Sequence, residues 1–241
     1  MSSSATQIDP LEGRVLPPAG LLARFSHYRK RYGFMHAILS YAGRHSFPFW
    51  KCVGPWITRK YLQNWLAAPG PHIVNLGGGS VLHERWLTAD VDPRSDVWSD
   101  VTAPLAFPDH STDVVYLEEV IEHVTKREGE ALLREVLRIL RPKGYLRITT
   151  PSLDYFMKAA QSSMVDTTPI NEIFYLHGHR HIYSELELQN MLQKVGYEHV
   201  ESSSYRDPNS KFGHFDTHPL RFEFAPHECS QYWEARKPQD A

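Results

Sequence analysis

Short apolar runs alternate with segments of helical periodicity along most of the chain. Six segments are candidate strands: residues 73–76, 86–91, 114–117 and 145–150, a stretch near 199–205, and residues 232–235. Residues 127–140 and 184–195 repeat apolar side chains at the spacing of a helix, and Gly196 is a typical stop for the second. Strands that alternate with helices predict an α/β fold: a Rossmann-like, doubly wound, mostly parallel sheet with ligands at its carboxyl edge.

The first 71 residues have a different pattern from the rest of the chain. Residues 1–18 are polar and end in two prolines, which predicts a disordered tail. Residues 19–71 are aromatic and helical in pattern, and they are expected to form an extension or lid on a main domain at 72–238. Its second helix is expected to follow Pro55, with Trp56 on the apolar side.

Composition and charge fit a soluble globular enzyme. Hydrophobic residues make up 41% and charged residues 22%, and both values are ordinary. The formal net charge of -2 gives no general attraction to nucleic acid or to anionic lipid, so neither is an expected partner. Cys52 and Cys229 have neither metal nor redox spacing, and no leader or membrane-spanning run is evident, so a cytoplasmic location is expected.

Three consecutive glycines, Gly77, Gly78 and Gly79, follow the first predicted strand. A turn without Cβ atoms lets a ligand lie against the backbone. Asp90 ends the next run, where a carboxylate suits ribose hydroxyls, and Asp100 is expected on the loop after a third strand, within reach of an adenine amino group. These residues predict a nucleoside pocket, although Asp90 could instead cap a local turn.

Four motifs in order carry a resemblance to one family: VNLGGGS, LEEVIEHV, LRILRPKGYLRITTPS and GHRHIYSELELQNMLQKVGY. Through them, residues 73–238 resemble class I S-adenosylmethionine-dependent methyltransferases of the type 11 kind, in particular a compact subgroup often found beside glycan and secondary-metabolite genes. The resemblance implies S-adenosylmethionine as the cofactor. The cofactor-binding residues that it implies are Asn75, Gly77, Gly78, Gly79, Asp90, Val91, Asp100, Val101, Leu117, Glu118 and Glu119. Glu118 and Glu119 could also be ordinary acidic residues in the first turn of a helix.

The crossover after the glycines is short. Only ten residues separate Gly79 from Asp90, where the family usually has nearly twice as many, and residues 80–85 can form barely two helical turns. The compact subgroup shares this short crossover, and the N-terminal extension is expected to fill the gap.

Residues 150–183 are too long for a simple connection and predict a lid insertion over the acceptor site. Within it, His177, His179 and His181 alternate, which would place three imidazoles on one face of an extended segment. No cysteine is nearby, and the alternating histidines are read on an extended segment and not on the helix that a zinc pair at i and i+4 needs, so no metal site is expected. The candidates for a general base are His179, His181 and His123. The residues expected to contact the acceptor are Tyr28, Tyr32, Tyr155, Tyr175 and Arg180.

The favoured function is methyl transfer to a small-molecule acceptor of the glycan or secondary-metabolite type, at oxygen or nitrogen, by a monomer or a homodimer. Two alternatives stay open. One is a catalytically silent protein that keeps the fold as a binding partner. The other is a nicotinamide-dependent oxidoreductase, which is disfavoured because the glycines read G-G-G-S and not G-x-G-x-x-G.

Overall fold

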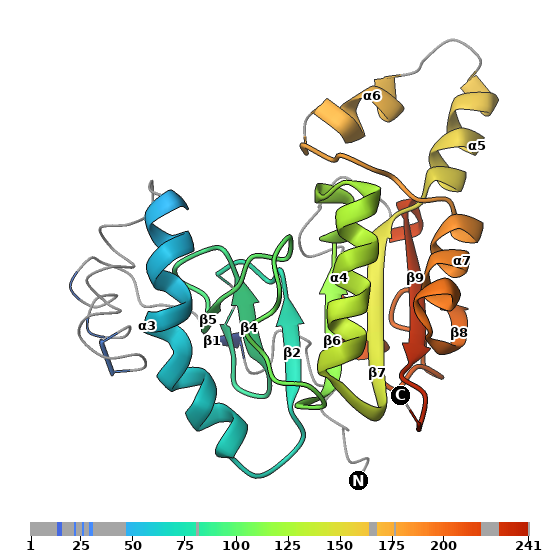
Figure 1. Cartoon of the computed structure of the whole chain (residues 1–241). Coiled ribbons are helices and arrows are strands. Elements are labelled where there is room, and N and C mark those ends of the chain that lie inside the picture. The colour runs from blue at the N-terminus through green and yellow to red at the C-terminus, as the bar shows by residue number, and fades with distance from the viewer. Residues whose placement is uncertain are drawn as a thin grey trace, which may run out of the picture.

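The structure, a computed structural model, describes residues 14–15, 22, 26, 29–30, 47–80, 82–163, 168–175, 177–217 and 227–240. Its centre is a seven-stranded sheet with the order β5-β4-β2-β6-β7-β9-β8 (Figure 1). The strands are β2 (Ile73–Leu76), β4 (Leu87–Asp90), β5 (Val97–Trp98), β6 (Thr112–Glu118), β7 (Leu140–Pro151), β8 (Glu198–Ser203) and β9 (Ser230–Arg236). Of these seven strands, β9 alone runs in the direction opposite to the other six. The mostly parallel, Rossmann-like sheet that the sequence predicts is confirmed.

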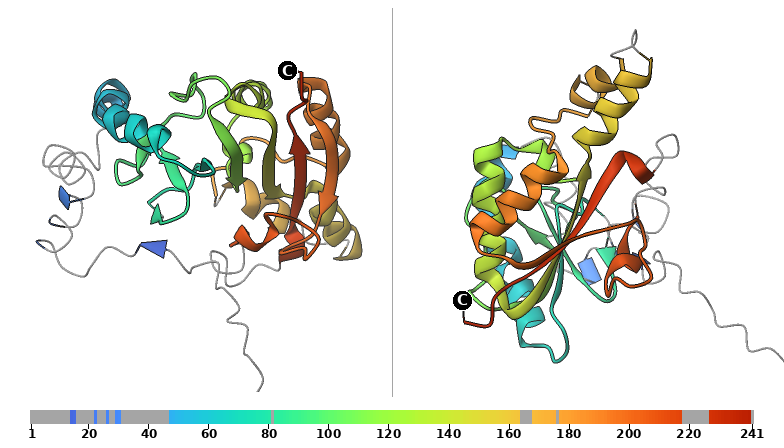
Figure 2. Two further views of the ribbon diagram at one scale, coloured as in Figure 1. Left: turned by 90° about the horizontal axis from the view of Figure 1, so that it is seen from below. Right: turned by 90° about the vertical axis from the view of Figure 1, so that its right-hand side faces the viewer.

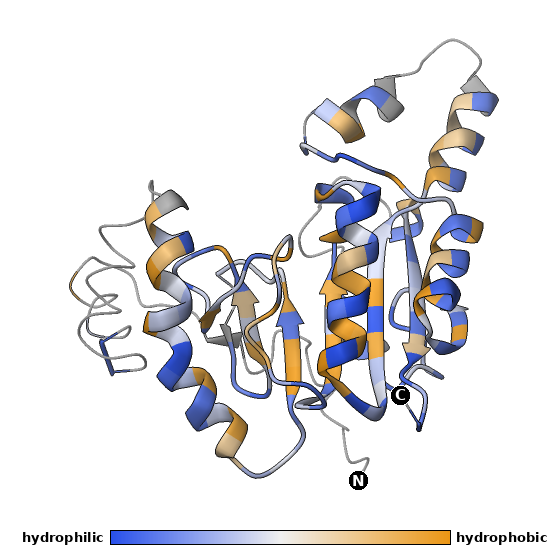
Figure 3. Ribbon diagram, viewed as in Figure 1, coloured by the Kyte–Doolittle hydropathy of each residue, from blue (hydrophilic) through white to orange (hydrophobic). Residues whose placement is uncertain are grey.

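Three helices cover one face of this sheet: α3 (Phe47–Ala67), α4 (Lys126–Ile139) and α7 (Glu185–Val195) (Figures 1 and 2). Alternate residues of the central strands point toward them, among them Val74, Leu76, Val115 and Leu117, all fully buried. Burial of each such side chain contributes about 1.5–3 kcal/mol. Figure 3 shows the same pattern, with hydrophobic central strands and an α4 that alternates between hydrophobic and hydrophilic residues.

The opposite face of the sheet carries an aromatic layer. The intervening strand residues Ile73, Val114 and Tyr116 pack there against Trp86, Phe212 and Phe215. Phe215 belongs to the short 3-10 helix η2 (Gly213–Phe215), and its ring meets that of Trp86 edge-on at 4.9 Å. In the described part of the chain, large rings therefore close this side of the core.

The ends of α4 and α7 follow from local sequence. Thr125 and Glu128 form a reciprocal capping box, so α4 begins at Lys126, one residue before the predicted start at residue 127. Ser184 caps α7 by accepting from the backbone N–H of Glu187, and Gly196 ends that helix in the left-handed conformation, as predicted.

Helix α3 differs from the prediction. It begins at Phe47, so Pro55 lies inside the helix and not before it. Trp56 is 76% exposed, and the buried side is formed instead by Trp50, Thr58 and Leu62. The reason is the approach of β5: a Cβ atom on Gly54 would lie 2.4 Å from the Trp98 ring, so the helix turns its glycine side toward the sheet.

The short crossover contains no helix in its described residues. Instead, β3 (Leu82–His83) pairs antiparallel with β1 (Arg14–Val15), two residues of the tail predicted to be disordered. The His83 ring stacks on Trp86 at 3.9 Å and fixes the return to β4. The ten residues of this crossover reach β4 through a turn and the short β3 strand, without a helix in the described residues.

Helices α5 (Leu153–Ser163) and α6 (Thr168–Tyr175) lie beyond the carboxyl end of β7 (Figure 1). They occupy the segment predicted to be a lid insertion. None of the helices in the described part of the chain has the length and apolar composition that crossing a membrane requires.

Candidate active site

The glycine turn follows β2 at the centre of the sheet. Gly77 and Gly79 have φ angles of +81° and +62°, which glycine adopts without strain. A Cβ atom on Gly77 would lie 2.4 Å from the Val120 side chain, and one on Gly78 would lie 2.4 Å from Nδ2 of Asn75. At Gly79 nothing lies within 4 Å of that position. The first two glycines are therefore required by packing, whereas Gly79 opens the turn to a ligand.

Asp90 joins the tip of β4 to this turn. One carboxylate oxygen accepts from the backbone N–H of Gly79 at 2.8 Å, and the other accepts from the N–H of Asp92 at 2.8 Å. The carboxylate thus caps a local turn and also faces the glycine backbone. Val91, the next residue, is exposed at the same edge.

Asp100 lies on the loop after β5 and is buried. Its Oδ1 accepts from the backbone N–H of Thr102 at 2.9 Å and from its hydroxyl at 2.7 Å. Nζ of Lys51, from α3, lies 3.7 Å from the other oxygen. Val101, beside it, packs partly buried against the core. The N-terminal helix therefore reaches the position predicted to face adenine.

Two acidic residues lie where β6 ends, Glu118 as its last residue and Glu119 just after it, and the C-terminal part of the chain anchors both. Glu118 is buried and accepts from the backbone N–H of Thr217 at 2.7 Å and from its hydroxyl. Glu119 has a φ of +56° and accepts from the Ser230 hydroxyl at 2.9 Å. A non-glycine residue in this conformation is strained by about 1–3 kcal/mol. Leu117 is fully buried among the core residues beneath them.

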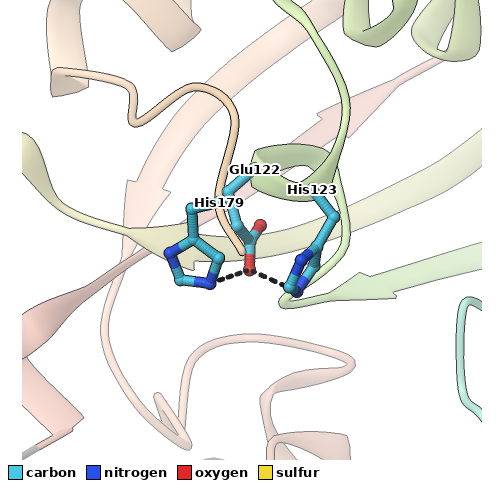
Figure 4. Close-up of side chains that lie close together, drawn as sticks. All are labelled: Glu122, His123 and His179. Atoms are coloured by element: carbon cyan, nitrogen blue, oxygen red, sulfur yellow. Dashed lines mark ion pairs between the residues drawn. The ribbon is translucent and has the colours of Figure 1, made fainter. Parts of the chain in front are cut away.

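A cluster of Glu122, His123 and His179 lies just beyond these acids. Glu122 and His123 belong to the 3-10 helix η1 (Ile121–His123), and His179 follows α6. Nε2 of each histidine lies 3.9 Å from the same carboxylate oxygen, so the two rings flank Glu122 (Figure 4). The side chains of Glu122, His179 and His123 are 0%, 7% and 46% exposed, so the cluster is open on one side only.

Hydrogen bonds fix the cluster in place. The carbonyl of Glu122 accepts from the backbone N–H groups of Arg180 at 2.7 Å and His181 at 3.2 Å, which holds the His179 segment against η1. The second carboxylate oxygen of Glu122 accepts from the Thr150 hydroxyl at 2.9 Å. Two segments that are distant in sequence are thus joined at one residue.

Burial, together with the neighbouring rings of His123 and His177, lowers the pKa of the His179 imidazole to about 4. Burial is also the main cause of the lowered pKa of His123. Both rings are therefore neutral at neutral pH and present unprotonated nitrogens.

The expected common face of three histidines holds for only two of them. Gly178 has a φ of +69°, which bends the segment, and the His177 and His179 rings stack at 5.5 Å. His181 turns away from the cluster and lies 3.1 Å from the carboxylate of Glu187.

Comparison with known proteins shows the family of the chain. Residues 53–202 match the family model of the methyltransferase domain. A probable S-adenosylmethionine-dependent methyltransferase of Mycolicibacterium smegmatis is 31% identical over 106 residues, which are 44% of this chain and 36% of that protein. The chain belongs to the class I S-adenosylmethionine-dependent methyltransferase family. Its match spans little more than a third of the curated relative.

Two solved structures resemble the methyltransferase in fold. One is an S-adenosylmethionine-dependent methyltransferase of Archaeoglobus fulgidus, with 14% identity, a TM-score of 0.46, and coverage of 88% of this chain and 99% of that one. The other is phosphoethanolamine N-methyltransferase 2 of Haemonchus contortus in complex with S-adenosylmethionine, with 13% identity, a TM-score of 0.43, and coverage of 89% and 60%. No acceptor or site residue is carried over from either.

S-adenosylmethionine is the cofactor of this methyltransferase, and the residues at the edge suit it. The open position at Gly79 allows close approach to the backbone. A carboxylate accepts about four hydrogen bonds, so Asp90 and Asp100 can accept from a nucleoside in addition to the backbone groups that they already hold. In a doubly wound sheet, ligands bind where the strand order reverses, and in this methyltransferase that point lies between β2 and β6.

The residues predicted to contact the acceptor are scattered. Tyr28 and Tyr32 lie outside the described residues. Tyr155 is half-buried at the start of α5, with its ring edge-on to Phe156, and Tyr175 is 83% exposed. Arg180 is paired with a carboxylate of α4, that of Glu128, at 3.1 Å.

Sequence reasoning about this methyltransferase missed Glu122 and Lys51. Glu122 immediately precedes a histidine that was singled out, so its adjacency to His123 was an available signal. The contacts of Glu122 with His179 and of Lys51 with Asp100 join separate elements, and no local pattern shows them.

Proposed function

We propose that this methyltransferase transfers the methyl group of S-adenosylmethionine to an oxygen or nitrogen of a small molecule, of the kind found in glycans or secondary metabolites. The observation that supports it is the position of the open Gly79 turn, with Asp90 and Asp100 on one side and the Glu122 cluster on the other. One half of the edge suits a nucleoside, and the other presents polar side chains to an acceptor.

In this proposal the backbone at Gly79 lies against the methionine part of the cofactor. Asp90 accepts from the ribose hydroxyls, and Asp100 with Val101 faces adenine. Glu118 and Glu119 lie toward the sulfonium, where their negative charge is favourable. When bound, S-adenosylmethionine supplies a methyl carbon activated by a positively charged sulfur.

The protein's contribution is chiefly alignment. Holding the acceptor atom, methyl carbon and sulfur in line contributes up to roughly 7–11 kcal/mol of barrier reduction. Helices α5 and α6, beyond the carboxyl end of β7, would act as a lid that excludes water, with Tyr155 on the inner end of α5. His123 and His179 are nearest to the acceptor, whereas His181, held by Glu187, would act only indirectly.

A small acceptor fits the charge of the chain better than RNA does. Nucleic-acid binding depends on neutralising phosphates with lysine and arginine. The chain has 26 such residues against 28 acidic ones. The half-buried cluster also opens on one side only, which suits a compact molecule.

The experiment is a transfer assay with deuteriomethyl-labelled S-adenosylmethionine. The purified protein is incubated with a metabolite extract of the encoding organism and, separately, with its total RNA and its protein. In the metabolite sample, mass spectrometry should find S-adenosylhomocysteine and a small molecule in which a trideuteriomethyl group has replaced a hydrogen. Asp90→Asn provides the background. Label appearing in RNA or protein, with none in small molecules, would contradict the proposed acceptor class.

A further inference from the structure

The Glu122 cluster contains more than methyl transfer requires. Displacement at a sulfonium needs alignment, and it does not by itself need a fully buried carboxylate between two imidazoles. One possible ligand atom from each of Glu122, His123 and His179 lies within 4.8 Å of the other two, and both Nε2 atoms are 3.9 Å from one oxygen. Ligands bonded at about 2.0–2.2 Å to one ion are about 3–3.5 Å apart. Small side-chain rotations would bring these three atoms around one ion.

We propose that Glu122, His123 and His179 bind a divalent first-row transition ion such as Mn²⁺, Co²⁺ or Zn²⁺. Two imidazoles and one carboxylate are a ligand set that suits such ions better than it suits Mg²⁺ or Ca²⁺, which favour oxygen ligands. Three protein ligands leave coordination positions open, as in catalytic metal sites and unlike closed structural ones. The half-exposed ring of His123 places those positions on the accessible side.

The surroundings of the three ligands are those of a built site. The Thr150 hydroxyl holds the second oxygen of Glu122, and the backbone of Gly178 hydrogen-bonds to the His123 ring. Such outer partners orient metal ligands.

The site lies next to the proposed cofactor turn. Gly77 packs directly against Val120, two residues before Glu122. If the proposed function holds, on which this step rests, the cation binds a hydroxyl oxygen of the acceptor and favours loss of its proton to water. The oxygen–hydrogen bond breaks, an oxygen–methyl bond forms and the sulfur–methyl bond breaks, which gives a methyl ether and S-adenosylhomocysteine. The acceptor class is then narrowed to hydroxyl compounds.

This proposal departs from the expectation of no metal site. That expectation used the spacing of histidines along the sequence. The ligands come instead from two segments on either side of α4, α5 and α6, joined by the hydrogen bonds from Arg180 and His181 to the Glu122 carbonyl.

The test is titration of the metal-free full chain with Co²⁺, followed by visible absorption and calorimetry. The wild type should bind one equivalent and develop the absorption bands of imidazole-ligated cobalt. His123→Ala and Glu122→Gln should weaken binding by about tenfold or more. The control is His227→Ala, because His227 is 45% exposed and lies 3.3 Å from the Glu228 carboxylate but has no place in the cluster. It should bind like the wild type.

Circular dichroism and S-adenosylhomocysteine binding are measured on every sample, to separate metal loss from misfolding and from loss of the cofactor site. No saturable cobalt binding by the wild type, or equal binding by folded His123→Ala, would overturn the cation site. Absence of S-adenosylhomocysteine binding, with cobalt binding intact, would overturn the proposed function and the acceptor role while the cation site stands.

Discussion

The two halves of the carboxyl edge are held together in different ways. In the half formed by β2, β4 and β5, the Asp90 carboxylate accepts hydrogen bonds from the backbone N–H groups of near neighbours. Asp90 accepts from Gly79, 11 residues away, and from Asp92, two residues away. In the half formed by β6, β7 and β9, side chains join distant segments: Thr217 donates to Glu118 across 99 residues.

In the proposed function, the first half binds the cofactor and the second half binds the acceptor, and the two kinds of contact suit these two ligands. A nucleoside is a fixed shape that backbone groups and one or two carboxylates can bind, so a local motif suffices. An acceptor site depends on which side chains tertiary packing brings together. The second half is therefore expected to be the less stable against loss of single long-range contacts.

The largest expected effect is on the buried ion pair that supports the second half. Arg147 and Asp216 are fully buried, and Nε of Arg147 donates to Asp216 at 2.7 Å. Asp216→Asn leaves a buried guanidinium without its main counter-charge and should lower the free energy of unfolding by about 3–5 kcal/mol. Urea denaturation measures it.

Asp109→Asn is the matched control, because Asp109 pairs with Arg138 at the same 2.7 Å but lies on the surface. It should change stability little. Similar losses in the two variants would show that burial does not distinguish the pairs.

A smaller effect is expected on the first half, and on cofactor affinity instead of stability. Asp90→Asn removes the charge that would face the ribose, and charge-assisted hydrogen bonds contribute about 1.5–3 kcal/mol. The Kd for S-adenosylhomocysteine should rise about tenfold or more. The control is Asp92→Asn. The partly exposed Asp92 carboxylate accepts from the backbone N–H of Arg94 at 2.9 Å, and its loss should leave the Kd for S-adenosylhomocysteine, measured by calorimetry, unchanged. Equal losses would remove the ribose role of Asp90.

The smallest effect concerns the contact of α3 with the first half. Nζ of Lys51 is 3.7 Å from Asp100, and the lysine side chain is 58% exposed. Exposed pairs of this kind contribute little, so Lys51→Met should weaken S-adenosylhomocysteine binding by less than about fivefold. Lys60→Met, at another exposed position of α3, serves as the control in the same titration. A loss far above fivefold would mean that α3 forms part of the cofactor pocket.

Much of the fold could be predicted from the sequence because its signals are local. The apolar runs at β2, β4, β6, β7 and β9 and the caps of α7 have clear signatures. The two-residue strands β1, β3 and β5 have none, since pairing alone defines them. The start of α3 was misplaced because Pro55 is typical of a helix boundary. In the structure α3 continues through Pro55, and Gly54 packs against Trp98.

The candidate site divides in the same way. The glycine turn, Asp90 and Asp100 were identified from spacing along the chain, and the structure places them at one edge. The grouping of Glu122 with His123 and His179 depends on how the segment after α6 returns to the sheet. Alternation of histidines predicted a shared face, but only the His177 and His179 rings stack, and His181 contacts the Glu187 carboxylate instead.

The most direct test of the central claim compares two glycines by calorimetry with S-adenosylhomocysteine. Gly79 and Gly70 both have positive φ angles, +62° and +114°, and both have nothing within 4 Å of a Cβ position. Alanine therefore introduces backbone strain without a clash in either place, but only Gly79 lies at the proposed cofactor turn. Gly79→Ala should reduce affinity at least about tenfold, since a methyl group would occupy the ligand's place, while Gly70→Ala should bind like the wild type. Equal affinity in the two folded variants, or no binding by the wild type, would contradict the account.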